Sequence, residues 1–421
     1  MPTPPRPRLL LLILAYLAFV SLGLPDGLIG VAWPSVRTDF HVPTEAVGLL
    51  LIASTAGYLT SSVAAGFSVA RLGVGWLLAG STVMASLALA GYSMTPGFIL
   101  MTGFALLLGL GSGAIDSGLN AYAASAFGPR HMNWLHAFFG LGVAVGPLIM
   151  TTVIGAGLAW RWGYGIVAGA QAVLAVAFVF TVHAWGNRRG AAGGGAAANP
   201  TGDLRTETIA ADTVDVEPVT PAVPPPIRDT LRLPAVWFGV LAFAAYVAIE
   251  LGAGLWAYLL LTEGRGLGAT AAGICVSGYY GSLFLGRVVQ GVVAERVGTA
   301  RVLWASMIGM AFGAVLVAVP GPAWLAVVGL AIVGFGAAPV FPLLTLTTAD
   351  RVGASHADRT IGLQIGVAGL AGAFVPAGIG VLISRIDVEV LGPALVVLSV
   401  LLLLVYAASN RQPRPASTTP S

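Results

Sequence analysis

Long apolar runs separated by short polar segments dominate the pattern along the chain. Most runs hold about 20 residues or more, enough to cross a ~30 Å hydrocarbon layer at ~1.5 Å per helical residue. The pattern predicts twelve membrane spans, at residues 9–34, 46–69, 75–95, 97–126, 132–157, 160–185, 233–261, 269–293, 299–319, 322–348, 360–384 and 390–409. The predicted fold class is all-α, a polytopic membrane protein.

Residues 186–232 interrupt this pattern with a stretch rich in glycine, proline and charge. Such a composition cannot bury a core, so we predict a disordered cytoplasmic linker. It separates an N-terminal six-helix half (residues 1–185) from a C-terminal six-helix half (233–409), and residues 410–421 form a predicted cytoplasmic tail. The halves echo each other at a spacing of 225 residues, which pairs Gly48 with Gly273 and Gly66 with Gly291. Repeated halves of this kind are typical of secondary transporters, whose solute site lies between the halves.

The distribution of arginine predicts how the chain is oriented. All 20 residues counted as lysine or arginine are arginine, and 15 of them fall on the predicted side of the two termini against 4 on the other. By the positive-inside rule both termini are cytoplasmic, and the protein is a multi-pass protein of the cell inner membrane. The remaining arginine, Arg287, lies within the eighth predicted span, where we expect it to snorkel or pair near the cytoplasmic surface.

Composition narrows the function classes. The chain is 57% hydrophobic and 9% charged, with a mean hydropathy of +0.90, and its net charge of +3 does not indicate a nucleic-acid partner. The sequence has no G-x-S-x-G, no H-E-x-x-H and no phosphate loop, so we expect no enzyme and no cofactor apart from protons as the coupling ion. The expected partners are a small-molecule solute and the lipid bilayer, with the chain as a monomer. A non-transporting sensor is a further class, although the linker holds no recognisable signalling domain.

Only three of the 17 acidic residues fall inside predicted spans: Asp26, Asp116 and Glu250. An ionised carboxylate at the bilayer centre costs ~2.5–3.5 kcal/mol even on lenient insertion scales. We therefore predict that these side chains face a cavity and carry protons, because a desolvated carboxyl group can load and release a proton near neutral pH. The alternative is a structural role, in which the acid forms hydrogen bonds between helices.

Helical spacing places other polar groups near these acids. Gly109, Ser112, Gly113 and Asn120 share the face of Asp116, which suits either solute and water or close helix packing. Trp33 shares a face with Asp26, as Tyr246 does with Glu250. The predicted substrate-binding residues are Asp116, Asn120, Trp33, Tyr246, Gln364, Asn133 and His136. For Gln364 an interhelical hydrogen bond remains the alternative, and for Asn133 and His136 a hydrogen-bonding or gating role.

Two loop segments carry a resemblance to a known family. "GFSVARLG" and "GVVAERVG" follow the second and eighth spans, and together they resemble the loop signature of the major facilitator superfamily. The matching residues are Gly66, Arg71, Gly73, Gly291, Glu295, Arg296 and Gly298. The resemblance implies that the acid of this motif, Glu295 in the C-terminal half, helps to lock one conformation at the cytoplasmic face. Ala70 replaces the expected acid in the N-terminal half, which puts the lock of that half in doubt.

A narrower resemblance concerns the first, fourth and fifth spans. "GLPDGLIGVAWP", and "DSGLNAY" followed by "RHMNWLHAFFGLGVAVGP", resemble the fucose–proton symporter-like sugar transporters. This implies proton-coupled symport of a small polar solute, a sugar, by alternating access. Asp26 would then carry the coupling proton, and Asp116 and Asn120 would bind solute hydroxyls. The alternative is a proton-coupled exporter of drugs or metabolites from the same superfamily.

The predicted orientation is directly testable. Protease added to right-side-out cells should leave residues 186–232 uncut, because the arginine distribution places them in the cytoplasm. An immunoblot of a terminally tagged chain measures the cleavage, and cleavage of this segment in intact cells would reverse the orientation.

Overall fold

The computed structural model describes residues 9–127, 129–186 and 226–411. Its α-helices are α1 (Leu9–Asp39), α2 (Val47–Leu72), α3 (Val74–Met94), α4 (Phe98–Ala126), α5 (Pro129–Gly155), α6 (Trp160–Thr181), α7 (Ile227–Leu231), α8 (Pro234–Leu259), α9 (Ala269–Val297), α10 (Thr299–Ala318), α11 (Ala323–Ala337), α12 (Val340–Leu346), α13 (Thr348–Val352), α14 (Ala354–Arg385) and α15 (Leu391–Asn410). Short helical turns join them: η1 (Thr44–Ala46), η2 (Val182–Trp185), the π-helical η3 (Leu260–Gly264) and η4 (Val388–Val390). These ranges contain no β-strand.

The predicted all-α polytopic fold is confirmed. Within the described ranges, eleven helical segments are long and apolar enough to cross a membrane. Helix α9 stands at the place of the predicted eighth span and is 29 residues long, but it is not among the eleven. Serine and tyrosine occupy its middle, at Ser277, Tyr279 and Tyr280. Most of the predicted linker and of the predicted tail lies outside the described residues.

The predicted tenth span is two helices in the structure. Helix α11 ends at Ala337, and α12 begins at Val340. Pro339 lies between them and has no N–H to donate, so the helical hydrogen-bond ladder breaks there. The apolar run of this span continues across the break, and hydropathy alone therefore could not reveal it.

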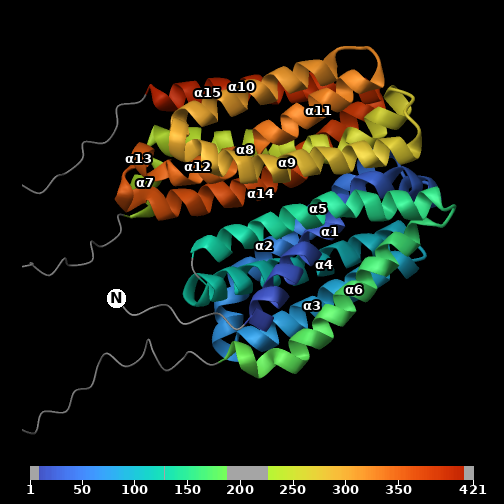
Figure 1. Cartoon of the computed structure of the whole chain (residues 1–421), viewed down its shortest axis with the longest axis vertical. Helices are drawn as coiled ribbons and strands as arrows, with labels where there is room; N and C mark the ends of the chain where they lie inside the picture. Colours follow the sequence, from blue (N-terminus) through green and yellow to red (C-terminus); the bar gives the residue numbers. More distant parts are fainter. Residues whose placement is uncertain (1–8, 128, 187–225, 412–421) are drawn as a thin grey trace, which may run out of the picture.

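The helices form two bundles, α1–α6 and α8–α15, which lie side by side (Figure 1). Within the first bundle α2 packs against α4. A Cβ added to Gly57 of α2 would clash with the carbonyl oxygen of Leu106, and one added to Gly109 of α4 would clash with that of Ser54. The two backbones therefore touch, as small residues allow in membrane helices.

The two bundles meet through the pairs α5 with α9, α2 with α14 and α1 with α8. We call the end where α1 begins and α15 ends the terminal end, and the opposite end the distal end. Near the distal end, a Cβ added to any of three glycines would clash with the other bundle: Gly30 with the Leu255 carbonyl, Gly48 with Ala377 and Gly273 with Thr151. Toward the terminal end, Gly66 of α2 and Gly362 of α14 face open space. The described interface is thus tight at its distal end.

Candidate functional site

Asp116 is the centre of a hydrogen-bonded cluster in the first bundle. Its Oδ2 accepts a hydrogen bond from the Tyr58 hydroxyl at 2.6 Å, and its Oδ1 accepts one from Asn120 Nδ2 at 3.0 Å. Tyr58 comes from α2 and the other two residues from α4, so the close approach of these helices builds the cluster. Asn120 Oδ1 is buried and has no hydrogen-bond partner. The cluster therefore offers an acceptor that a bound hydroxyl group could satisfy.

Tyr58 was missed by sequence reasoning. It is separated from Asp116 by 58 residues, so nothing in the local pattern joins the two side chains. The sequence did offer one indication: Tyr58 lies beside Gly57 and one turn before Ser61 and Ser62, in a small and polar stretch of an otherwise apolar span.

Asp26 lies in the middle of α1 and is nevertheless exposed. Its helix neighbours on the same side, Leu22, Gly23 and Gly30, are buried. α1 packs against helices of both bundles, α5 and α8 among them, so the exposure marks an internal opening between the bundles. The carboxylate interacts electrostatically with Tyr58 of α2 and Tyr280 of α9, one from each bundle.

Glu250 of α8 anchors a second cluster in the other bundle. The Tyr246 hydroxyl donates to its carboxylate, and the Tyr279 hydroxyl donates to its backbone carbonyl at 2.8 Å. Arg287 Nη2 of α9 lies 3.5 Å from Glu250 Oε1. Arg287 precedes the end of its helix, Val297, by ten residues, and it pairs with Glu250 at that depth. Arg287 was expected either to snorkel to the membrane surface or to form a pair, and the structure shows that it pairs with Glu250.

Arg287 and His136 lie at the junction of the two bundles. A Cβ on Gly140 of α5 would lie 3.6 Å from Arg287 Nη1, so the guanidinium reaches the backbone of the opposite bundle. His136, one helical turn before Gly140, is exposed and interacts electrostatically with both Asp116 and Arg287. Its ring also packs edge-on against Phe19 of α1, with centroids 5.4 Å apart. The two clusters therefore face each other across one opening.

Two other predicted residues lie apart from the clusters. Trp33 is buried, and its indole N–H donates to the Thr44 carbonyl at 2.9 Å near the distal end. Gln364 of α14 is buried and accepts a hydrogen bond from Thr348 at 3.2 Å, which corresponds to the interhelical alternative. Asn133 lies on α5, and its side chain is outside the described part of the structure.

The loop-motif residues lie at the terminal end. Gly73 closes α2 with φ +78° and Gly298 closes α9 with φ +95°, a region of backbone conformation that favours glycine. Arg71 stacks over the Phe67 ring at 4.1 Å, and Glu295 is exposed, as is Arg296. Gly66 and Gly291 lie within α2 and α9. In the described part of the chain neither Arg71 nor Glu295 forms an ion pair.

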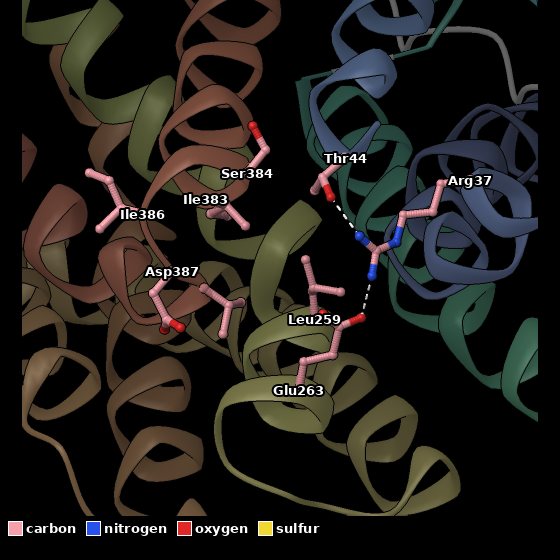
Figure 2. Close-up of a pocket in the computed structure, with 9 residues that line it drawn as sticks. Arg37, Thr44, Leu259, Glu263, Ile383, Ser384, Ile386 and Asp387 are labelled. Carbon is pink, nitrogen blue, oxygen red and sulfur yellow. Dashed lines mark hydrogen bonds and ion pairs between the residues drawn. The ribbon is translucent and has the colours of Figure 1, made fainter. Parts of the chain in front are cut away.

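A cavity of about 390 Å³ lies between the bundles at the distal end (Figure 2). Arg37, Thr44, Glu263 and Asp387 are among the residues that line it. Arg37 of α1 donates to Glu263 Oε1 of η3 and to Thr44 Oγ1, both at 2.5 Å. This ion pair joins the two bundles in the wall of the cavity, and none of the three carboxylates within the spans lines the cavity.

The sequence matches the model of a known protein family. The family model described as Major Facilitator Superfamily matches residues 15–376, with a further match over residues 253–421. This chain belongs to the Major Facilitator Superfamily. The superfamily assignment makes the protein a transporter, not an enzyme, with a small-molecule solute and a lipid bilayer as its partners. No curated protein sequence matches the chain.

Solved structures of other transporters share the fold of this superfamily member. A mutant of the nucleoside transporter NupG aligns with a TM-score of 0.72 at 13% sequence identity, covering 95% of this chain and 99% of the other. A mutant of the peptide transporter POT in complex with sulfate aligns with a TM-score of 0.69 at 15% identity, covering 97% of each chain. At these identities the likeness concerns the fold alone.

The Arg37–Glu263 pair should act as a latch that holds the distal end closed. Arg37→Gln removes the charge, and an ion pair of this partial exposure contributes ~0.2–1 kcal/mol. We therefore expect the ratio of distally open to distally closed molecules to rise by ~1.4–5-fold. Distances between spin labels placed at Leu158 and Trp324, in a Cys275→Ala background, measure the ratio.

The matched control for this experiment is Arg161→Gln. Arg161 pairs with Asp39 at 2.8 Å, and both residues belong to the first bundle. Loss of this pair should leave the distance distribution unchanged. Equal shifts in the two variants would show that the Arg37 pair has no specific part in closure.

Proposed function

We propose that this protein is a proton-coupled symporter that takes up a small polar solute, a sugar, by alternating access. The observation that carries the proposal is the set of three carboxylates inside the spans, which face one opening between the bundles. Two of them, Asp116 and Glu250, have hydrogen-bonding partners, whereas Asp26 is exposed in the middle of its helix. Carboxylates placed in this way are characteristic of proton and solute pathways.

The Asp116 cluster is suited to bind hydroxyl groups. The carboxylate can accept hydrogen bonds from a solute, and Asn120 Oδ1 supplies a second acceptor on the same helix face. Tyr58 fixes the orientation of the carboxylate from α2. Sugars present several hydroxyl groups at close spacing, which supports a sugar as the solute.

Asp26 is the proposed coupling residue. No hydrogen bond described in the structure involves its carboxylate, and the opening gives it access to water. A proton can therefore reach it without breaking an existing contact. The segment around it, "GLPDGLIGVAWP", also carries the resemblance to fucose–proton symporter-like transporters.

The conformation supports alternating access. The distal end is closed by close helix contacts and by the Arg37–Glu263 pair, while Gly66 of α2 and Gly362 of α14, toward the terminal end, face open space. We propose that the terminal end is cytoplasmic, so that the structure represents an inward-facing state in the cell inner membrane. Rocking of the two bundles about the carboxylates would then expose the same site outward.

The proposal separates the roles of two carboxylates. Asp26→Asn mimics the protonated acid, so it should abolish accumulation driven by a proton gradient while counterflow exchange of solute continues. Asp116→Asn should weaken binding itself by ~10–150-fold, because a charge-assisted hydrogen bond contributes ~1.5–3 kcal/mol. Asn120→Ala should have a milder form of the same defect. Proteoliposomes with an imposed proton gradient and a panel of labelled sugars measure both activities.

Asp39→Asn is the matched control, since Asp39 lies at the distal end and outside both clusters. It should leave both accumulation and exchange intact. If Asp26→Asn still concentrates the solute against its gradient, Asp26 is not the coupling residue.

A further inference from the structure

Arg287 is unusual among the basic residues of this protein because of its depth. In the described part of the chain, the other arginines lie within two turns of a helix end or outside the long helices. Arg287 follows the start of α9, Ala269, by 18 residues and precedes its end by ten. A cation at this depth marks a substrate or ion pathway by default, and the proposed coupling scheme does not use it.

Helix direction explains why Arg287 meets Glu250. Side chains tilt toward the N-terminus of their own helix. Since α8 runs from the terminal to the distal end and α9 runs back, Glu250 leans toward the terminal end and Arg287 toward the distal end. Their Nη2–Oε1 separation is 3.5 Å, longer than a strong charge-assisted hydrogen bond of about 2.7–2.9 Å. Both side chains are partly exposed, at 23% and 17%. The guanidinium therefore retains donors that a second anion can reach.

The charges around the opening limit an anionic ligand to a single negative charge. Three carboxylates, those of Asp26, Asp116 and Glu250, surround the opening, and Arg287 is the one permanent cation that faces them in the described structure. A dianion such as phosphate would be repelled by the remaining carboxylates. A single carboxylate can instead accept two parallel hydrogen bonds from the planar guanidinium.

We propose that Arg287 binds a carboxylate group of the solute, and that Glu250 takes up a proton as it gives up the guanidinium. This inference rests on the proposed transport function and narrows its solute to a sugar acid. The carboxylate sits on Arg287 in one bundle, and the hydroxyl groups bind the Asp116 cluster in the other. Proton uptake by Glu250 avoids a lone carboxylate in the membrane and balances the charge of the solute, in addition to the coupling proton that Asp26 carries.

Titratable groups near Glu250 could also make uronate binding depend on pH. Those that interact with Glu250 are Tyr246 of α8 itself and Tyr279, Tyr280 and Arg287 of α9. Asp26 of α1 interacts with the same Tyr280. Helices α11 and α12, which contact α8, carry no titratable group. Across the junction, His136 faces Asp116 and Arg287. Because a histidine also titrates in the physiological range, and because Asp26 is the proposed coupling residue, the test must separate both residues from Glu250.

The test measures binding to the full chain in nanodiscs by calorimetry. The probes are D-glucuronate and D-galacturonate, each beside its neutral parent, D-glucose or D-galactose. At least one uronate should bind more tightly than its parent, and Arg287→Gln should weaken that binding by ~10–150-fold. Arg287→Lys keeps the charge but cannot donate two parallel hydrogen bonds, so its affinity for the uronate should lie between those of Arg287→Gln and the unchanged protein. Arg301→Gln, at an exposed arginine of α10, is the matched control and should change nothing.

The pH dependence provides the second readout. Because Glu250 must gain a proton when the uronate binds, the affinity should fall as pH rises, by up to ~tenfold per pH unit. In an Asp26→Asn background, which removes any contribution of the coupling proton, Glu250→Gln mimics the protonated acid and should bind the uronate equally well at about pH 5.5 and about pH 7.5. His136→Gln in the same background should keep the slope of the Asp26→Asn protein. A slope that persists in Glu250→Gln, or one that disappears only in His136→Gln, overturns the inference.

The outcomes distinguish this inference from the proposed function. If no uronate binds in an Arg287-dependent manner, the inference falls. The proposed function still stands if proteoliposomes concentrate a neutral sugar under a proton gradient. If a uronate binds through Arg287 but no solute accumulates under that gradient, the carboxylate site stands and proton-driven symport is wrong.

Discussion

A carboxylate inside a hydrocarbon layer needs either a bonding partner or water, and this requirement governs the middle of the protein. Asp116 has Tyr58 and Asn120 as partners, and Glu250 has Tyr246 and Arg287. Asp26 is exposed instead, so water can reach its carboxylate. The two bundles must therefore leave an opening between them at this depth, and the tight contacts of the interface lie toward its distal end.

Close helix packing supplies the precision that these contacts need. The Tyr58–Asp116 hydrogen bond, at 2.6 Å, depends on α2 and α4 approaching until their backbones touch at Gly57 and Gly109. A larger side chain at either glycine would push the helices apart and pull the tyrosine from the carboxylate. Glycine residues that look like simple spacers in the sequence thus determine the geometry of a functional group on the neighbouring helix.

Sequence reasoning could predict the spans and the three carboxylates for the same physical reason. An apolar run has to cross the membrane, and a charge within it has to be accommodated, so both signals are local. The first span was predicted to end at residue 34, but α1 continues to Asp39, because a helix can extend past its apolar stretch into water. The break at Pro339 was missed because apolar residues flank it on both sides.

The partners of the carboxylates could not be predicted in this way. Glu250 and Arg287 stand on different helices, and so do Asp116 and Tyr58. Their pairing depends on which helices are neighbours and on which faces meet, and these are properties of the packed fold. At the repeat spacing of 225 residues, Glu250 falls one residue from the position equivalent to Asp26, but the repeat does not show that one carboxylate is exposed and the other paired.

The Arg37–Glu263 pair at the distal end is sensitive to the salt concentration around it. Arg37 and Glu263 are partly exposed, at 25% and 46%, so dissolved ions screen their attraction. The screening length is ~30 Å in 0.01 M salt and ~8 Å in 0.15 M salt. In the proposed orientation the distal end faces outward, so a dilute medium would strengthen the ion pair and a saline medium would weaken it. In that orientation, the salinity outside the cell would affect how readily the transporter opens.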